Sequence, residues 1–168
     1  INNKKKPFRI SKRFFLYYGM ESSIKKKIEH FCAYQERCHL EVSNKLKKLG
    51  VYGDEIDEYI CSLLDGNFLC ETRFAELFAR GKFNNNDWGK IKIINELKSR
   101  NISEWNIKNA LKQIDNKDYL EKLDKLCLKK IEQIDKSQNQ IKSKILRALS
   151  YKGWEVDLII KSINQLTK

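Results

Sequence analysis

The sequence has 168 residues, of which 41% are hydrophobic and 33% are charged, and it contains a single proline. This composition favours a soluble helical protein with wide solvated faces. The apolar run at residues 14–18 is too short to span a membrane, and no long apolar stretch with a small-residue cleavage site follows the first basic residues. We therefore expect a cytoplasmic protein without a membrane span or a secretory signal.

The net charge of +12 is concentrated near the N-terminus. Residues 1–28 contain nine basic side chains and one acidic side chain, Glu21, and so contribute +8 of that total. Such a segment is attracted to nucleic acid or to another acidic surface by a salt-sensitive force that does not read sequence. We predict a basic, aromatic arm at residues 1–21. Its aromatic side chains at 14–18 either form a stacking surface for single-stranded nucleic acid, dock on the first helix, or become ordered by contact.

A pattern of apolar and turn-forming positions recurs three times along the rest of the chain. Leu46, Leu97 and Leu149 align at spacings of 51 and 52 residues. A β-branched residue stands four positions before each leucine: Val42, Ile93 and Ile145. A residue that tolerates a positive φ stands four positions after each leucine: Gly50, Asn101 and Gly153. Each copy therefore predicts a helix that ends at a left-handed residue and is followed by a second helix.

We predict an all-α fold, an elongated array of three tandem three-helix repeats. The repeats occupy residues 22–70, 71–116 and 117–168. Arrays of this kind usually bind other macromolecules along an extended face, which favours a binding protein over an enzyme. In the first repeat, we expect the first helix to begin at Ser22 or Ser23, the second to end at Gly50, and Asp54 to cap the third.

The second and third repeats show the same helical periodicity. In the second repeat, the polar stretch at 84–87 predicts a loop that ends in a cap for a helix at 88–100, and Ser103 is expected to cap the next helix. The elements predicted for the third repeat are a long helix from Asp118, a loop at 137–139, and helices at 141–152 and 155–166. Alanine at Gly50 or Gly153 is expected to cost about 1 kcal/mol if the backbone there is left-handed.

The five cysteines contain no Cys-x-x-Cys pair, which predicts reduced thiols. His30, Cys32, Cys38 and His39 are close enough in sequence to suggest a zinc site. However, Cys32 and Cys38 are six residues apart and would face different sides of a continuous helix. We therefore interpret them as buried structural thiols, and we expect neither a metal nor another cofactor.

The residues that carry chemistry in enzymes are not arranged for catalysis here. The two histidines lack partners for a Ser–His–Asp arrangement, and the sequence has neither a glycine-rich phosphate loop nor a paired acid and base. We therefore expect a protein that is not an enzyme.

The cations of the second repeat are the candidate contact residues for a phosphate-bearing or carboxylate-bearing partner. They are Arg73, Arg80, Lys82, Lys90, Lys92, Lys98 and Arg100. The alternative is a solvated helix face, on which Lys98 and Arg100 favour the helix C-terminus. Trp88 either stacks on a base or a partner side chain, or packs between repeats. Arg73 either points outward or pairs with a neighbouring glutamate.

Several stretches of the sequence resemble the RecX family, which regulates the bacterial RecA recombinase. Residues 32–39 and 41–42 resemble its first repeat, residues 73–83, 88–98 and 102–103 resemble its central repeat, and Asp115 with Asp118-Tyr119 matches the entry to its third. The resemblance covers about residues 24–166. It departs at the basic arm and at Asn101, where a glycine is common in the family.

The resemblance implies a small, monomeric modulator that lies in the helical groove of the RecA–DNA filament and bridges neighbouring subunits. Such a protein suppresses ATP hydrolysis and strand exchange and acts in homologous recombination, DNA repair and the SOS response. Contact with DNA, single- or double-stranded through the filament, is implied as well. Two other functions stay open: general nucleic-acid binding through the arm and the middle repeat, and a helical scaffold for an unrelated protein.

Overall fold

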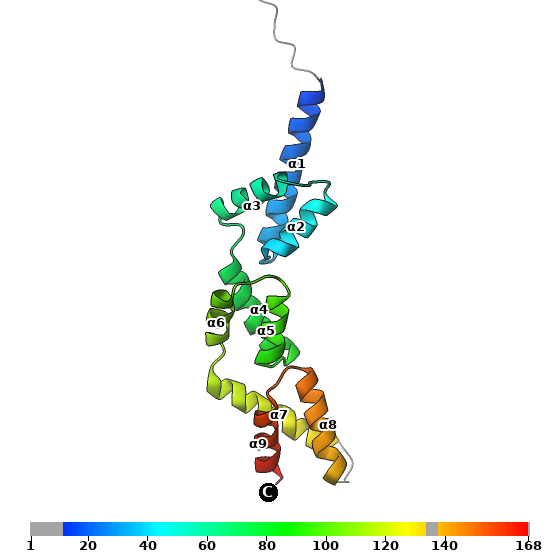
Figure 1. The fold of residues 1–168 in the computed structure, drawn as a ribbon, viewed down its shortest axis with the longest axis vertical. Helices are drawn as coiled ribbons and strands as arrows, with labels where there is room; N and C mark the ends of the chain where they lie inside the picture. Colours follow the sequence, from blue (N-terminus) through cyan, green and yellow to red (C-terminus); the bar gives the residue numbers. More distant parts are fainter. Residues whose placement is uncertain (1–11, 134–137, 168) are drawn as a thin grey trace, which may run out of the picture. The chain divides into compact units, whose positions relative to one another are not determined.

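The computed structural model describes the backbone of residues 12–133 and 138–167 and the side chains of residues 22–133 and 141–167. The described residues form α-helices and no strand, which confirms the all-α prediction (Figure 1). The helices are α1 (Lys12–Tyr34), α2 (His39–Lys48), α3 (Glu55–Asp65), α4 (Glu71–Asn86), α5 (Lys90–Lys98), α6 (Glu104–Lys112), α7 (Asn116–Gln133), α8 (Gln138–Tyr151) and α9 (Val156–Leu166). The chain divides into two compact units, residues 1–69 with α1–α3 and residues 70–168 with α4–α9.

The same turn ends the second helix of each repeat. The φ angles of Gly50, Asn101 and Gly153 are 87°, 60° and 84°, as the aligned positions predicted. In each repeat, the backbone N–H of the following residue donates to the carbonyl of the aligned leucine at 3.1 Å. This six-to-one hydrogen bond around a left-handed residue is the Schellman motif, which satisfies carbonyls that the helix end would otherwise leave open. The three copies are therefore equivalent in backbone structure as well as in sequence.

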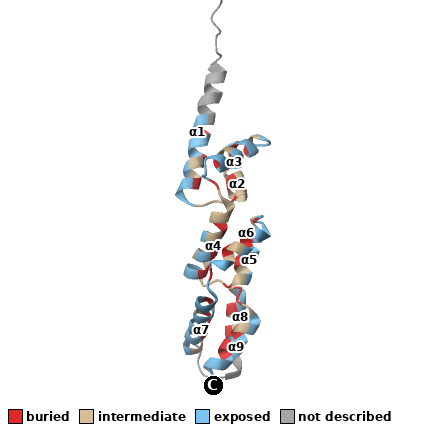
Figure 2. Cartoon of the chain, turned by 90° about the vertical axis from the view of Figure 1, so that its left-hand side faces the viewer, coloured by how far each residue is buried: buried red, intermediate tan, exposed pale blue. Residues whose placement is uncertain are grey.

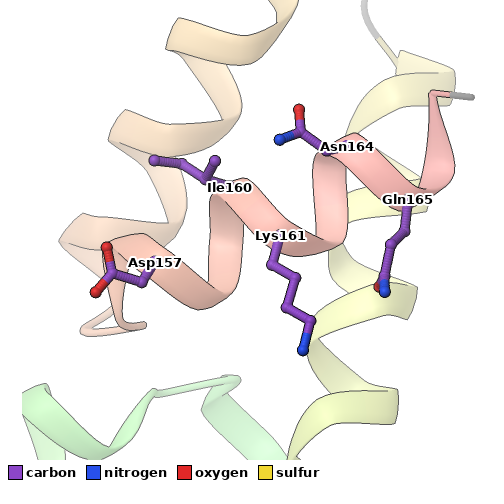
Figure 3. A pocket seen from close by; sticks show the side chains of 5 residues that line it. All are labelled: Asp157, Ile160, Lys161, Asn164 and Gln165. Carbon is purple, nitrogen blue, oxygen red and sulfur yellow. The ribbon is translucent and has the colours of Figure 1, made fainter.

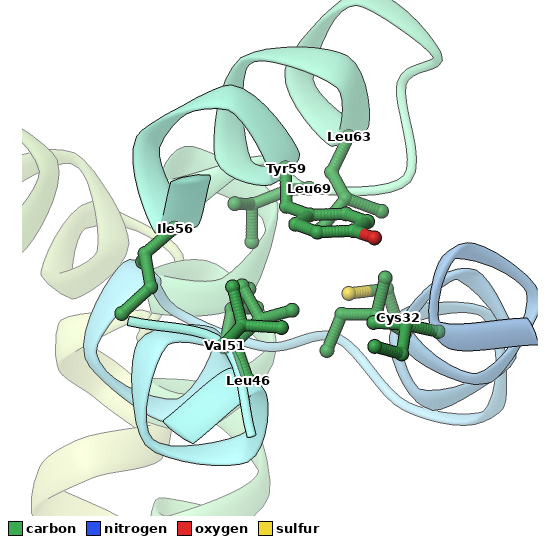
Figure 4. Packing of buried hydrophobic residues seen from close by; sticks show 10 residues of the cluster. Cys32, Leu46, Val51, Ile56, Tyr59, Leu63 and Leu69 are labelled. Atoms are coloured by element: carbon green, nitrogen blue, oxygen red, sulfur yellow. The ribbon is translucent and has the colours of Figure 1, made fainter. Parts of the chain in front are cut away.

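The core of the first unit forms where α1, α2 and α3 meet. Ile28, Val42 and Leu46 are fully buried there, and α3 contributes Tyr59 and Leu63 (Figure 4). These positions follow the helical spacing of the sequence, so each helix turns one apolar stripe toward the other two. The first unit consequently has a core of its own.

The second unit contains the remaining two repeats, and the helices of each carry buried residues, drawn in red in Figure 2. In the second repeat, Phe74 and Ala79 of α4 are buried with Ile93 and Leu97 of α5. In the third repeat, the buried side chains come from all three helices: Tyr119, Leu123, Cys127, Ile145, Leu149, Ile159 and Ile163. Small residues at Ala75, Ala79 and Ala110 have no exposed surface, which is consistent with close packing of α4 on α6.

Several predicted helix boundaries are wrong. Helix α8 begins at Gln138 rather than at residue 141, so residues 138 and 139 of the predicted loop at 137–139 are helical. Helix α1 begins at Lys12, so Ser22 and Ser23 lie inside the helix and do not cap it. Helix α4 continues through the polar stretch to Asn86, and the next helix begins at Lys90 rather than at residue 88. Residues 1–11, and with them most of the predicted arm, lie outside the described part of the chain.

Distant lysines explain why α4 continues. Lys122 of α7 donates to the carbonyls of Phe83 and Asn84 at 2.7 and 2.8 Å, and Lys152 donates to the carbonyl of Asn86 at 3.2 Å. Lysine side chains that bind the last carbonyls of a helix stabilise its C-terminus and interact favourably with its dipole. Asp87 then ends the helix with a left-handed backbone, at φ 57°.

The other predicted caps have the expected positions. The Ser103 hydroxyl accepts a hydrogen bond from the backbone N–H of Asn106 at 3.3 Å, which confirms its role as the cap of α6. Asp54 is the residue before α3, but its side chain makes no capping hydrogen bond.

The described cysteines are free thiols. Cys32 and Cys38 are buried, which confirms their interpretation, and burial raises the pKa of the Cys32 thiol to about 11. Cys127 is also buried, whereas Cys61 on α3 is exposed.

Candidate partner-binding surface

Four of the eight predicted contact residues lie together on the second unit. With two aromatic neighbours they form a cation–aromatic surface, which consists of Phe78, Lys82, Trp88, Lys92, Arg100 and Tyr151. The Lys82 ammonium lies 5.4 Å from the Phe78 ring centre and 5.1 Å from that of Trp88. The Lys92 ammonium lies 4.7 Å from the Trp88 ring and 4.6 Å from the Tyr151 ring. Cations and aromatic rings thus alternate across this surface.

Local helix geometry brings these side chains together. Phe78 and Lys82 are four residues apart on α4 and therefore lie on one face. The left-handed backbone at Asp87 redirects the chain after α4, and the Trp88 ring packs edge-on against Phe78 at 6.3 Å between centres. Tyr151 is the last residue of α8, in the third repeat, so the surface draws on both repeats of this unit.

An aromatic face holds a lysine in place without neutralising its charge. A cation over a ring gains about 0.5–1 kcal/mol at an exposed site, because the ring quadrupole attracts it, but the ring carries no net charge. Lys82 and Lys92 are half-buried and form no ion pair with any other described residue, so their positive charge remains to attract an anionic partner.

Arg100 and Lys98 differ in this respect. The Arg100 guanidinium pairs with Glu96 at 2.6 Å while its carbon lies 5.0 Å from the Phe78 ring centre. Lys98 pairs with Glu104 at 3.4 Å. Both cations are therefore compensated by carboxylates of their own repeat, as in a solvated helix face.

The remaining predicted cations lie apart from this surface. The Lys90 ammonium lies 4.4 Å from the Tyr119 ring centre and donates to the Asn116 side chain at 2.9 Å. Arg73 and Arg80 of α4 line a separate shallow hollow with Glu76 and two uncharged side chains.

The junction of the second and third repeats, next to the cation–aromatic surface, is held by aromatic stacking. The Tyr119 and Trp154 rings stack at 4.5 Å between centres, and Phe83 contacts both. Trp154 is buried and its indole N–H donates to the Asp87 carbonyl at 3.0 Å. Trp154, rather than Trp88, is therefore the tryptophan that fills the junction between repeats.

The Asp87 carboxylate forms ion pairs with both lysines that bind the last carbonyls of α4. Its carboxylate lies 3.1 Å from the Lys122 ammonium and 3.3 Å from that of Lys152. Burial opposes the ionisation of Asp87, but the two lysines outweigh burial and hold the pKa of the carboxyl below its usual value. The sequence pattern predicted Asp87 as a helix cap. Its side chain instead joins α4 to the third repeat.

Tyr119 adds a polar link between the same repeats. Its hydroxyl accepts from the backbone N–H of Lys90 at 2.9 Å and donates to the Glu155 carboxylate at 2.5 Å. Burial and the Glu155 carboxylate raise the pKa of this phenol above its usual range, so the hydroxyl keeps the proton that it donates.

Two glycines allow the backbones of the two repeats to touch. The Gly89 N–H donates to the Lys152 carbonyl at 2.9 Å, and the Ile91 N–H donates to the Gly153 carbonyl at 3.1 Å. A Cβ on Gly89 would lie 2.2 Å from the Gly153 carbonyl oxygen, and one on Gly153 would lie 2.3 Å from the Lys92 backbone nitrogen. The junction therefore requires glycine at both positions.

A second shallow hollow of this unit runs along α9 (Figure 3). Its lining residues are Asp157, Ile160, Lys161, Asn164 and Gln165. Acidic and basic side chains balance there, and Lys142 of α8 donates to Asn164 at 3.3 Å. The charge of this hollow therefore selects no class of partner.

The described residues meet neither the requirements of a metal site nor those of a membrane span. No group of three or more histidine, cysteine, aspartate or glutamate side chains among them is arranged to hold a metal ion. Among the same residues, no helix is both long and apolar enough to cross a membrane.

Residues 71–111 match the family model described as RecX, second three-helix domain. This segment contains the cation–aromatic surface except for Tyr151. The chain is 30% identical over 138 residues to Regulatory protein RecX of Oceanobacillus iheyensis, covering 82% of this chain and 51% of the relative. It is 27% identical over 126 residues to Regulatory protein RecX of Acinetobacter baylyi, covering 75% and 77% of the two chains. The chain thus spans about half the length of the first of these relatives.

A solved structure supports the same relationship. The crystal structure of RecX from Lactobacillus salivarius superposes with a TM-score of 0.76 at 28% identity, covering 89% of this chain and 98% of that one. The fold defines a helical-repeat protein, and its relatives are named as regulatory proteins. The chain belongs to the RecX family.

Proposed function

We propose that this protein regulates a RecA recombinase by binding in the groove of the RecA–DNA filament, where it lowers ATP hydrolysis and strand exchange. The observation that carries the proposal is the cation–aromatic surface, which apart from Tyr151 lies within the segment that matches the RecX domain model. A filament of protein and DNA presents repeated carboxylate and phosphate groups, which attract such a surface.

The mechanism that we propose is non-catalytic. Lys82 and Lys92 contact acidic groups of the filament, and Trp88 supplies apolar area between them. The backbone contact at Gly89 and Gly153 joins the second and third repeats, so that they bind as one piece. Contacts to adjacent RecA subunits through this piece oppose the rearrangement that accompanies ATP turnover, and so lower the ATPase rate.

The proposal is tested by titrating the protein into a RecA ATPase assay on single-stranded DNA. We expect inhibition that weakens by about tenfold or more when Lys82→Glu and Lys92→Glu are combined, because two attractive contacts become repulsive. Lys108→Glu is the matched control, since Lys108 is exposed on α6, outside the surface. Equal inhibition by the wild type and the double variant would contradict the assigned surface, and an unchanged ATPase with wild type would contradict the function.

A second candidate function is general nucleic-acid binding through the basic arm and the middle repeat. It is favoured by Tyr151, which is 79% exposed, together with Lys92 over its ring. Exposed aromatic rings among lysines are typical of surfaces that bind single strands. Tight DNA binding that falls steeply between two salt concentrations, with no effect on RecA, would favour this function.

A further inference from the structure

The first unit has a hollow of its own between α1 and α2. We call it the α1–α2 hollow, and its lining residues are Lys27, His30, Phe31, Tyr34, Lys45 and Leu49. Tyr34 is 81% exposed, whereas Phe31, Lys45 and Leu49 are half-buried. The hollow therefore has an apolar floor and basic side chains around it.

Aligning the first repeat with the second shows how the residues that line the α1–α2 hollow differ from their equivalents. With the 51-residue spacing of the first two repeats, Lys45 corresponds to Glu96 and Leu49 to Arg100. In the second repeat, the Glu96 carboxylate pairs with Arg100 at 2.6 Å, and Arg100 covers the ring of Phe78. The second repeat thus supplies both the carboxylate and its cationic partner from its own chain.

The first repeat carries the opposite charge at the equivalent place. Lys45 stands where the second repeat has its glutamate, and no carboxylate is among the six described residues that line the hollow. Leu49 is shorter than the arginine that it replaces. The lining of the α1–α2 hollow therefore has a lysine where the second repeat has its acid, and it retains apolar space beside that lysine. The nearby Glu41 carboxylate pairs with Arg37 at 3.7 Å and is not part of the lining.

We propose that the α1–α2 hollow binds an acidic peptide segment of a protein partner. An apolar side chain of the peptide lies between Tyr34 and Leu49, and flanking carboxylates contact Lys27 and Lys45. Charge complementarity supports this occupant, because an incoming carboxylate would pair with Lys45 much as Arg100 pairs with Glu96 in the second repeat, with the two charges exchanged. The apolar floor adds affinity by burying the side chain that the carboxylates flank.

Single-stranded nucleic acid fits this hollow less well. Stacking of successive bases requires several open aromatic faces. The Phe31 ring already has the Arg37 guanidinium 4.1 Å and the Lys45 ammonium 5.6 Å from its centre, which leaves Tyr34 as the exposed ring of the lining. One exposed ring beside an aliphatic floor suits a single apolar side chain.

The test is fluorescence anisotropy of the full chain with a labelled peptide in which one phenylalanine is flanked by aspartate and glutamate residues. We expect Lys45→Glu to weaken binding by about tenfold or more, because attraction becomes repulsion, and Tyr34→Ala by about fivefold. A peptide with serine in place of phenylalanine should also bind more weakly to the wild type.

Matched controls come from the same unit. Lys48→Glu changes an exposed lysine on the same helix, and Tyr52→Ala removes a tyrosine that is 67% exposed, both outside the hollow. These controls should bind the peptide like the wild type, and circular dichroism should show that all four variants are folded. The proposal is overturned if the controls lose as much affinity as the hollow variants, or if neither hollow variant loses any.

A parallel titration with labelled oligothymidylate separates the two ligand classes. Loss of oligonucleotide binding in Tyr34→Ala and Lys45→Glu, without peptide binding by the wild type, would assign the hollow to nucleic acid and overturn the proposal. The inference goes beyond the proposed function and does not rest on it. The combined Lys82→Glu and Lys92→Glu variant, designed to lose RecA inhibition, should still bind the peptide.

Discussion

Replacing Gly153 with alanine should lower the free energy of unfolding of the second unit by more than the cost of placing alanine in a left-handed backbone. An L-residue at φ 84° costs about 1 kcal/mol relative to glycine. The added Cβ would also lie 2.3 Å from both the Cβ and the backbone nitrogen of Lys92. Forcing an extra carbon into packed structure costs about 1–3 kcal/mol, so we expect a total of about 2–4 kcal/mol.

Urea unfolding followed by tryptophan fluorescence measures this effect. All three tryptophans lie in the second unit, so their emission reports on that unit. With a urea dependence of about 2 kcal/mol per molar, the expected loss lowers the midpoint by about 1–2 M. Trp154 is buried at the junction of the second and third repeats. Its fluorescence therefore reports on the backbone contact that Gly153→Ala would disturb.

Two other glycines provide controls. Gly81 lies inside α4, and a Cβ added there would have no neighbouring atom within 4 Å, so Gly81→Ala should stabilise the same unit by about 0.5–1 kcal/mol. Gly50 has a φ of 87°, but an added Cβ would likewise meet nothing within 4 Å, so Gly50→Ala should cost only about 1 kcal/mol, measured by circular dichroism. If Gly153→Ala costs no more than Gly50→Ala, the close approach to Lys92 is refuted.

Three further predictions concern charge, capping and thiol access. Asp87→Asn should lower the free energy of unfolding at pH 7 relative to the wild type. The gap between the two proteins should shrink as the pH falls below 3.8 through the lowered pKa of Asp87, because protonation then removes the same ion pairs from the wild type. Urea unfolding of both proteins at pH 7 and pH 3 checks this prediction. Ser103→Ala should cost about 1 kcal/mol in the same urea assay, because the N–H of Asn106 loses its partner. With a thiol reagent on the folded protein, Cys61 should react first, whereas Cys32 should react only on unfolding, since it is buried and its pKa is raised; equal rates would refute this assignment.

The sequence was sufficient to predict the features that each repeat determines locally. The aligned leucines are buried in all three repeats, and the left-handed positions and the Ser103 cap are where the spacing placed them. These features depend on residues within about one helical turn of each other. They can therefore be read without knowing how the repeats pack.

What the sequence did not predict depends on contacts between repeats. Helix α4 runs through three asparagines because Lys122 and Lys152, far along the chain, bind its last carbonyls. Tyr151 joins the candidate surface through packing of the third repeat on the second, and no spacing rule connects it to Lys92. The early start of α1 was missed because the segment before Ser22 is rich in cations and aromatic residues.

The glycine contact between the second and third repeats also limits how such a protein can evolve by rearrangement. Asn101 and Gly153 occupy the same place in their repeats, and each has a left-handed backbone. A copy of the second repeat inserted in place of the third would set an asparagine side chain against the backbone of Lys92, where no atom beyond hydrogen fits. The order of these modules is therefore not interchangeable, although their sequences follow one pattern.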